Sequence, residues 1–229
     1  ALCYKNGAEN PLAHVRNGPQ TLEQIRALSQ LDEKGKCKNV MIAAPLRLHD
    51  CSLVTDGAAA LVVTQTANVS NRARAVEIAG IGHSAERLAE NVRPNMHELM
   101  AGKVAAAKAY QEAGITAADI DFAEVHDCFT INLLLSTEAL GLSADGRACF
   151  DLLDGRFTRD DRCPVNLSGG LKSKGHPVGA TGASMHALAY KQLIGEPIGV
   201  AAKKAEIGVV YNVGGSSVTN CVTVLKAPR

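Results

Sequence analysis

Residues 166–184 read N-L-S-G-G-L-K-S-K-G-H-P-V-G-A-T-G-A-S, and this stretch decides the fold and the function that we predict. Five glycines and Pro177 surround a single histidine, His176. A glycine-rich turn that leads into a helix lets backbone N–H groups and one imidazole approach a ligand closely. The alternative is a tight loop with an ordinary histidine, since most histidines do no chemistry. The glycine loop is therefore the first candidate site.

On both sides of this loop, predicted strands alternate with predicted helices. We predict helices over residues 22–30, 96–113, 130–140 and 183–194, and strands over residues 56–64, 73–82, 122–125, 165–168, 207–212 and 218–225. Residues 1–20 and 145–162 are expected to be irregular. This alternation predicts an α/β fold with a mixed, mostly parallel sheet, in which the last two strands form an antiparallel hairpin.

Three of the predicted strand ends carry unusual polar residues. They are residues 126–128 (H-D-C), 175–177 (G-H-P) and 212–214 (N-V-G). Ligands of open α/β sheets bind at the carboxyl ends of the strands. We therefore expect these three segments to converge on one site, although each taken alone could be a loop with a polar tip.

Composition excludes several function classes. Of 229 residues, 46% are apolar and 21% are charged, with a net charge of +1, so that neither disorder nor nucleic-acid binding is favoured. Seven scattered cysteines without C-x-x-C spacing indicate reduced thiols and no metal site. No apolar run reaches the ~20 residues of a membrane span. We expect an intracellular, reducing location, which would be the cytoplasm in a bacterium and a peroxisome or mitochondrion in a eukaryote.

The glycine loop resembles the C-terminal active-site motif of thiolases, G-G-x-x-x-x-G-H-P-x-G-x-[ST]-G. Every fixed position is present, in Gly169, Gly170, Gly175, His176, Pro177, Gly179, Thr181 and Gly182. Residues 56–60 match the family's D-G-A-A-A, and residues 126–129 read H-D-C-F where most thiolases have N-E-A-F. The H-D-C-F form, with Lys5-Asn6 and Asn10-Pro11 upstream, looks like the sterol-carrier-protein branch.

This resemblance covers nearly the whole chain and implies a thiolase-like layered αβα fold. Residues 1–72 would be the remainder of the loop region and a linking strand, and residues 73–229 the C-terminal domain. Acyl-CoA and coenzyme A would be substrates, with no further cofactor. The β-ketoacyl synthases have a related fold and a similar glycine turn, but G-H-P and D-G-A-A-A favour thiolases.

The resemblance also implies roles for particular residues. His176 would activate the nucleophile and stabilise an enolate oxygen, together with a water held by His126. Cys128 would be the acid/base for the α-proton, the Gly214 N–H would contribute to a second oxyanion hole, and Ser52 would lie near coenzyme A. For Cys128 the alternative is a small buried hydrophobic residue.

Two departures from the thiolase pattern affect the interpretation. Residues 212–214 read N-V-G where ordinary thiolases have C-x-G, so the usual acid/base cysteine is missing there. The nucleophilic cysteine of thiolases belongs to an N-terminal half, and Cys3 lacks the surroundings that would lower a thiol pKa. We expect the C-terminal half of a thiolase, with a missing N-terminal half as partner and a homodimer or higher oligomer as the assembly. A thiolase-like aldolase or acyltransferase component, and a non-catalytic half that binds acyl-CoA or supports an oligomer, remain as alternatives.

Overall fold

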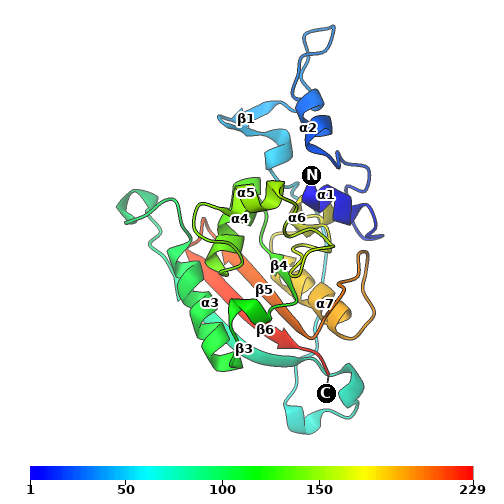
Figure 1. Cartoon of the computed structure of the whole chain (residues 1–229), viewed down its shortest axis with the longest axis vertical. Coiled ribbons are helices and arrows are strands. Elements are labelled where there is room, and N and C mark those ends of the chain that lie inside the picture. The colour runs from blue at the N-terminus through cyan, green and yellow to red at the C-terminus, as the bar shows by residue number, and fades with distance from the viewer. Residues whose placement is uncertain (229) are drawn as a thin grey trace.

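A four-stranded mixed sheet forms the centre of the computed structural model, which describes residues 1–228 (Figure 1). The strand order is β3-β6-β5-β4, with β3 at Glu77–Ala85, β4 at Phe122–Val125, β5 at Ile207–Gly214 and β6 at Thr219–Lys226. β4 and β5 are parallel, whereas β6 is antiparallel to both β5 and β3. The predicted α/β class, mixed sheet and C-terminal hairpin are confirmed, but antiparallel pairing exceeds the mostly parallel pairing that we expected.

Helices cover both faces of this sheet. The helices α3 (Met100–Ala113) and α4 (Thr130–Ala139) lie on one face, and α7 (Thr181–Leu193) lies on the other. Side chains of a strand alternate between faces. Accordingly, Val209 and Tyr211 belong to the apolar cluster of α3 and α4, whereas Val210 packs with Met185 and Ala189 of α7. The result is the predicted three-layered arrangement of helix, sheet and helix.

The packing of α3 on the sheet depends on two glycines of β3, Gly80 and Gly82. A Cβ added to Gly80 would lie 2.2 Å from the carbonyl oxygen of Ala109, and one added to Gly82 would lie 1.7 Å from that of Ala105. The backbones of β3 and α3 are therefore in contact, which only glycine on the strand permits. Gly114 ends α3 in the left-handed conformation at φ 65°, as the sequence predicts.

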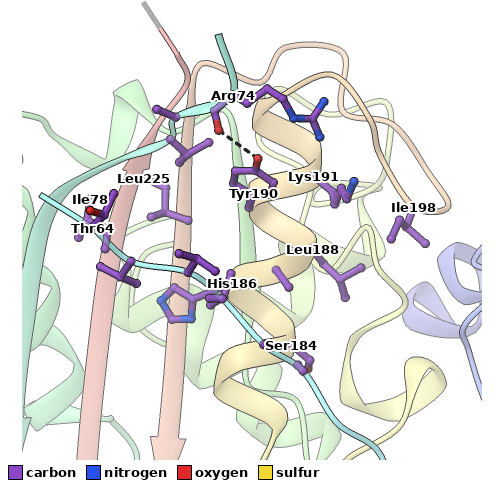
Figure 2. A pocket seen from close by; sticks show the side chains of 18 of the residues that line it. Thr64, Arg74, Ile78, Ser184, His186, Leu188, Tyr190, Lys191, Ile198 and Leu225 are labelled. Atoms are coloured by element: carbon purple, nitrogen blue, oxygen red, sulfur yellow. Dashed lines mark hydrogen bonds between the residues drawn. The ribbon is translucent and has the colours of Figure 1, made fainter. Parts of the chain in front are cut away.

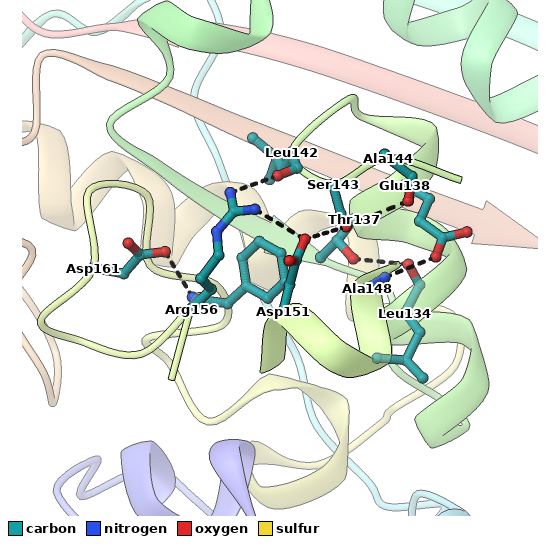
Figure 3. Close-up of polar contacts among 11 residues, drawn as sticks. Leu134, Thr137, Glu138, Leu142, Ser143, Ala144, Ala148, Asp151, Arg156 and Asp161 are labelled. Atoms are coloured by element: carbon teal, nitrogen blue, oxygen red, sulfur yellow. Dashed lines mark hydrogen bonds and ion pairs between the residues drawn. The ribbon is translucent and has the colours of Figure 1, made fainter. Parts of the chain in front are cut away.

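The predicted loop over residues 145–162 contains a helix, α5 (Ala148–Leu153), so this prediction was wrong in part. Figure 3 shows the polar contacts that hold the segment. Oε1 of Glu138 on α4 accepts a hydrogen bond from the N–H of Ala148 at 3.0 Å, and Arg156 donates to Asp151 at 2.9 Å and to the Leu142 carbonyl at 2.8 Å. Glu138 and Arg156, the partners of Ala148 and Asp151, lie outside the helix, which explains why the sequence of the helix itself gave no helix signal.

The N-terminal region adds short elements beyond one end of the sheet (Figure 1). They are α1 (Leu2–Gly7), α2 (Leu22–Leu28), β1 (Met41–Ala43) and β2 (Leu46–Arg47). Thr21 caps α2 as predicted, but α1 forms where irregular chain was expected. The cause is again tertiary, because Asn6 donates to the Asn166 carbonyl at 3.0 Å and Asn10 to the Ser168 carbonyl at 2.7 Å. The domain division at residues 72 and 73 stays a prediction.

Shorter elements complete the chain. They are α6 (Gly170–Lys174) and the 3₁₀ turns at Leu48–Asp50, Thr66–Asn68, Arg72–Arg74, Glu90–Val92 and Ala117–Asp119. The strand predicted over residues 165–168 is reduced to one parallel bridge between Val165 and Ala123. Within residues 1–228, no helix is both long and apolar enough to span a lipid bilayer.

The buried strand predicted over residues 56–64 is wrong. This segment has no regular structure, and Val62 and Val63 are 97% and 70% exposed. A β-strand needs a neighbour for its backbone N–H and C=O groups, and no strand of the described chain pairs with it. A cavity of about 1170 Å³ separates the segment from α7, and Figure 2 shows its walls, with Thr64 and Ile78 facing the helix that carries His186.

Candidate active site

Three segments meet at one end of the sheet. His126 follows β4 and lies beside Asn212 of the parallel neighbour β5, because the carboxyl ends of parallel strands point the same way. The N–H of His126 donates to the Tyr211 carbonyl at 3.0 Å, and its Nδ1 lies 2.8 Å from Oδ1 of Asn212. His176 comes from the glycine loop, and its ring centroid lies 5.1 Å from that of His126, with the rings at 88°. The two predicted histidines are therefore direct neighbours.

A buried carboxylate fixes the glycine loop against the turn that carries His126. Oδ1 of Asp127 accepts a hydrogen bond from the backbone N–H of Leu171 at 2.6 Å, and its Oδ2 accepts one from the backbone N–H of Lys172 at 3.3 Å. Gly170, at φ 57°, lies so close that an added Cβ would be 2.5 Å from Asp127. Burial raises the pKa of Asp127, against the lowering effect of these hydrogen bonds. The carboxyl group thus holds the first turn of α6, and with it the approach to His176.

The chain that precedes His176 is equally confined. Gly175 has a φ of 119°, and an added Cβ would lie 2.5 Å from the ring of His14. The backbone of His14 donates to the Lys174 carbonyl at 3.1 Å, and that of Thr55 donates to the His176 carbonyl at 3.5 Å. Segments from the N-terminal region and the linker therefore hold the histidine from both sides.

The hydrogen bonds of Thr181 favour the Nδ1–H tautomer of His176. The Thr181 hydroxyl lies 3.0 Å from the Pro177 carbonyl, which only accepts, and 2.7 Å from Nδ1 of His176; with its single hydrogen given to the carbonyl, the hydroxyl accepts from Nδ1–H. Burial lowers the pKa of His176 to about 4, and the neighbouring His126 and the Lys174 ammonium add to this effect. At neutral pH the imidazole is uncharged, its Nε2 is bare, and it can act as a base.

Two further ionisable groups are buried behind the histidines. Oε2 of Glu124 on β4 accepts a hydrogen bond from the hydroxyl of Ser168 at 2.6 Å, and burial raises the pKa of Glu124 to about 7. The Nζ of Lys174 donates to Oγ of Ser184 at 2.9 Å. Burial lowers the pKa of Lys174, and the charge of Glu124 opposes that shift. The ammonium group therefore adds positive potential close to both imidazoles.

The other predicted site residues make no side-chain hydrogen bond to the two histidines among the described residues. Cys128 is half-buried beside the apolar cluster of α7, and burial raises its thiol pKa to about 11. Its carbonyl accepts a hydrogen bond from the N–H of Ser52 at 2.7 Å, which places Ser52 next to the H-D-C-F turn. Gly214 is exposed at the end of β5, two residues beyond Asn212. The acid/base, coenzyme A and oxyanion roles stay predictions.

Cys3 is unsuited to be a nucleophile. It is buried in α1, and its thiol donates to Oδ2 of Asp127 at 3.1 Å. Burial first, and then the charge of Asp127, raises the thiol pKa well above its ordinary value. A thiol that is protonated and hydrogen-bonded to a carboxylate is inert toward a thioester.

Sequence reasoning missed three residues that organise the site. Asn212 and Asp127 were noticed as parts of polar strand ends and of family motifs, and Thr181 as a motif position, but none was given a role. A signal was present for Asn212, since an amide at the end of a buried strand normally has a specific partner. For Thr181 and Asp127 the partners became visible only in three dimensions.

Comparisons with known proteins agree with the thiolase resemblance of the sequence. The family described as thiolase C-terminal domain-like matches residues 80–227. The acetyl-CoA acetyltransferase of Methanothermobacter thermautotrophicus is 35% identical over 222 residues, which are 96% of this chain and 55% of that protein. Human sterol carrier protein 2 is 35% identical over 212 residues, 88% of this chain and 37% of that protein. The chain thus spans about half the length, or less, of these curated relatives.

Among solved structures, the Ltp2-ChsH2(DUF35) aldolase has a similar fold. The TM-score is 0.79 at 20% sequence identity, and the similarity covers 100% of this chain and 56% of that one. At this identity the match supports the layered fold that was predicted from the glycine loop, and it carries no conclusion about activity.

Proposed function

Because the chain belongs to the thiolase C-terminal domain-like family, we propose that it is the C-terminal half of a thiolase-type acyl-CoA acyltransferase. The reaction would be thiolysis of a 3-ketoacyl-CoA, or the reverse condensation of two acyl-CoA molecules. The observation that carries this proposal is the pair of neighbouring imidazoles, with His126 at the carboxyl end of β4 and His176 in the glycine loop. The nucleophilic cysteine would come from an N-terminal half, since this chain spans about half the length, or less, of its relatives.

The protonation state of His176 fits the first step. Its bare Nε2 would take the proton of the nucleophilic thiol, and the thiolate would attack the keto carbon. The bond between the α-carbon and that carbon then breaks, so that an acyl-enzyme and a coenzyme A enolate form. The resulting imidazolium of His176, now protonated at Nε2, would donate to the enolate oxygen, and loss of such a donor typically costs ~2.7–4 kcal/mol of transition-state stabilisation.

The first half-reaction is completed by a group that protonates the enolate at its α-carbon. Cys128 is the predicted donor, and its pKa of about 11 keeps it a thiol at neutral pH, as a proton donor to an enolate must be. In the second half-reaction the Cys128 thiolate would take the thiol proton of free coenzyme A, which attacks the acyl-enzyme thioester, and the departing nucleophile would recover its proton from His176. A water held by His126 would stabilise the enolate, and the Gly214 N–H would support the oxyanion of the acyl-enzyme step.

Substitution of Cys128 tests this assignment. The chain would be co-expressed with the N-terminal half of the Methanothermobacter acetyltransferase, and deuterium uptake at the α-carbon of acetyl-CoA would be followed. Cys128→Ala should reduce exchange by about 100-fold or more, since acid/base groups contribute ~10²–10⁴. Cys149→Ala, at an exposed thiol on α5, is the matched control. Normal exchange in Cys128→Ala would move the acid/base role to another group.

A thiolase-like aldolase is the second candidate, because Asn212 replaces the usual acid/base cysteine. Such an enzyme would cleave a carbon–carbon bond without an acyl-enzyme. Trapping the acyl-enzyme by acid quench and mass spectrometry distinguishes the two. An acylated cysteine supports the thiolase, and turnover without one supports the aldolase. For the location we infer a reducing, intracellular compartment, since none of the seven cysteines is paired among the described residues.

A further inference from the structure

We propose that Asn212 is the positioning residue of His126: its Oδ1 accepts the Nδ1–H of the imidazole, 2.8 Å away, and so leaves Nε2 as the proton acceptor beside His176. This inference rests on the proposed function for its consequence in catalysis, but the contact itself can be tested independently. It explains why two departures from the common thiolase pattern occur together. His126 stands where N-E-A-F has asparagine, and Asn212 stands where C-x-G has cysteine.

Both backbones of this pair are held by the sheet. Val125 and Tyr211 are register partners in the parallel pairing of β4 and β5. His126 and Asn212 are the residues that directly follow them. The N–H of His126 donates to the Tyr211 carbonyl, and the side chain of Asn132 donates to the His126 carbonyl. The imidazole is therefore presented to Asn212 by a fixed main chain.

The amide of Asn212 is confined as well. Its Nδ2 would lie 3.1 Å from a Cβ added to Gly182, in the first turn of α7. With Nδ2 directed to that helix, Oδ1 is the atom that meets His126. An amide oxygen only accepts hydrogen bonds, so Nδ1 of His126 must carry the hydrogen, and a neutral imidazole then has a bare Nε2. Within residues 1–228 no protein group donates to this Nε2, which leaves it available to a bound water or to substrate.

The surroundings keep His126 neutral. Burial lowers its pKa, whereas the hydrogen bond to Asn212 and the charge of Asp127 act in the opposite direction. The ammonium group of Lys174, on α6, lowers the pKa further, and the ring of His176 faces it from the glycine loop. Since an amide does not titrate, Asn212 accepts from Nδ1–H of His126 at every pH at which the imidazole is neutral, which a cysteine that can ionise would not do.

The consequence for the reaction is a division of tasks. Asn212 cannot take or give a proton, so it cannot replace the cysteine of C-x-G as acid/base. Instead it orients an imidazole. The bare Nε2 of His126 can hold the water that stabilises the enolate, Cys128 can remain the acid/base for the α-proton, and His176 can remain dedicated to the nucleophile.

Nitrogen-15 spectra of the histidine rings test the contact directly. Magic-angle-spinning spectra of protein labelled with ¹⁵N-histidine do not require a monomer, and His126→Asn assigns the signals by difference. We expect a protonated Nδ1 and a bare Nε2 for His126. In Asn212→Leu the Nε2–H form should appear, whereas Asn212→Asp should restore Nδ1–H and raise the pKa of His126 through its added charge. A protonated Nε2 in the wild-type chain, or a spectrum of Asn212→Leu unchanged from it, would overturn the proposal.

An activity measurement on the co-expressed assembly separates positioning from simple stability. Asn212→Leu should lower kcat for α-proton exchange by about 100-fold or more with KM little changed. Asn212→Asp should recover most of the rate, with the acidic limb of the pH profile displaced upward. Equal loss in both variants would contradict a positioning role. If the wild-type assembly is inactive but the spectra show a protonated Nδ1 and a bare Nε2 for His126, the proposed function is wrong and the positioning of His126 by Asn212 is supported.

Discussion

At the scale of single residues, burial shifts the pKa values of the histidines and of Glu124 toward their uncharged forms. His176 has a lowered pKa and Glu124 a raised one, and burial is the leading cause for both. In the thiolase chemistry that we propose, a neutral imidazole is the form able to receive a thiol proton. The two groups should therefore change the pH dependence of the free energy of unfolding in opposite directions.

We predict that the free energy of unfolding contains a His176 contribution that falls on acidification. The pKa of His176 is about 4 in the folded chain against 6.5 for the free side chain, so the unfolded state binds more protons in between. This contribution is complete above pH 6.5 and is lost progressively toward pH 4. Urea unfolding at pH 7 and pH 5 checks it, and His176→Asn should lose less stability between them than the wild type.

Glu124→Gln supplies the contrast for that experiment. The pKa of Glu124 is raised from 4.5 to about 7, so its contribution is complete below pH 4.5 and lost as pH rises through 7. Removal of this group should make the chain lose more stability on acidification than the wild type. Identical pH dependence in His176→Asn, Glu124→Gln and wild type would contradict both assignments.

At the scale of elements, the layer of α3 on β3 depends on a backbone contact. The Ala-rich helix approaches so closely that a Cβ on Gly82 would lie 1.7 Å from the Ala105 carbonyl. The atom in the way belongs to a helix backbone, which cannot move aside as a flexible side chain could. A substitution at Gly82 must displace the whole helix.

We predict that Gly82→Ala destabilises the chain by ~3 kcal/mol, at the upper end of the ~1–3 kcal/mol usual for overpacking. Gly179→Ala is the control, because a Cβ there would meet nothing within 4 Å. Denaturant unfolding followed by circular dichroism measures both. A Gly82→Ala variant as stable as Gly179→Ala would show that α3 does not pack as described.

At the scale of the whole molecule, an apolar segment lies in solvent. Leu61, Val62 and Val63 are 41%, 97% and 70% exposed, on the side of the cavity opposite to α7. Ala187 and Tyr190 of α7 line the same cavity. Apolar area in water costs about 25 cal/mol per Å², so this region favours association with another chain or domain.

We predict that the isolated chain elutes as an oligomer in size-exclusion chromatography and binds a hydrophobic dye. Replacing Val62 and Val63 together by serine should lower dye binding markedly. Leu88→Ser is the matched control, since Leu88 is 80% exposed in a different loop. A stable monomer with weak dye binding would refute the expectation of a missing partner.

The isolated chain should also lack thiolase turnover. Cys3 is hydrogen-bonded to Asp127, and the pKa values of Cys128 and Cys163 are raised by burial to about 11 and about 12. None of them offers a thiolate at neutral pH. Loss of acetoacetyl-CoA in the presence of coenzyme A is the assay, and rapid turnover by the pure chain would contradict this prediction.

The sequence by itself determined the elements whose signals are local. Phe122–Val125 is a strand with the predicted bounds, Gly114 ends α3, and the final two strands pair as a hairpin. Backbone preferences of glycine and alternation of apolar residues act within a few positions, so they can be read from the chain. The glycine loop likewise marked the site and the family, because its chemistry is concentrated in one continuous stretch.

Tertiary structure alone decided the rest. The Asn6 side chain holds α1 on the Asn166 carbonyl, Glu138 accepts the first N–H of α5, and residues 56–64 stay irregular because the described chain offers them no neighbouring strand. The site shows the same dependence, since His126 and Asn212 are 86 residues apart in sequence. Which nitrogen of an imidazole carries the proton is set by its hydrogen-bond partner, and that partner is chosen by how β4 and β5 pair.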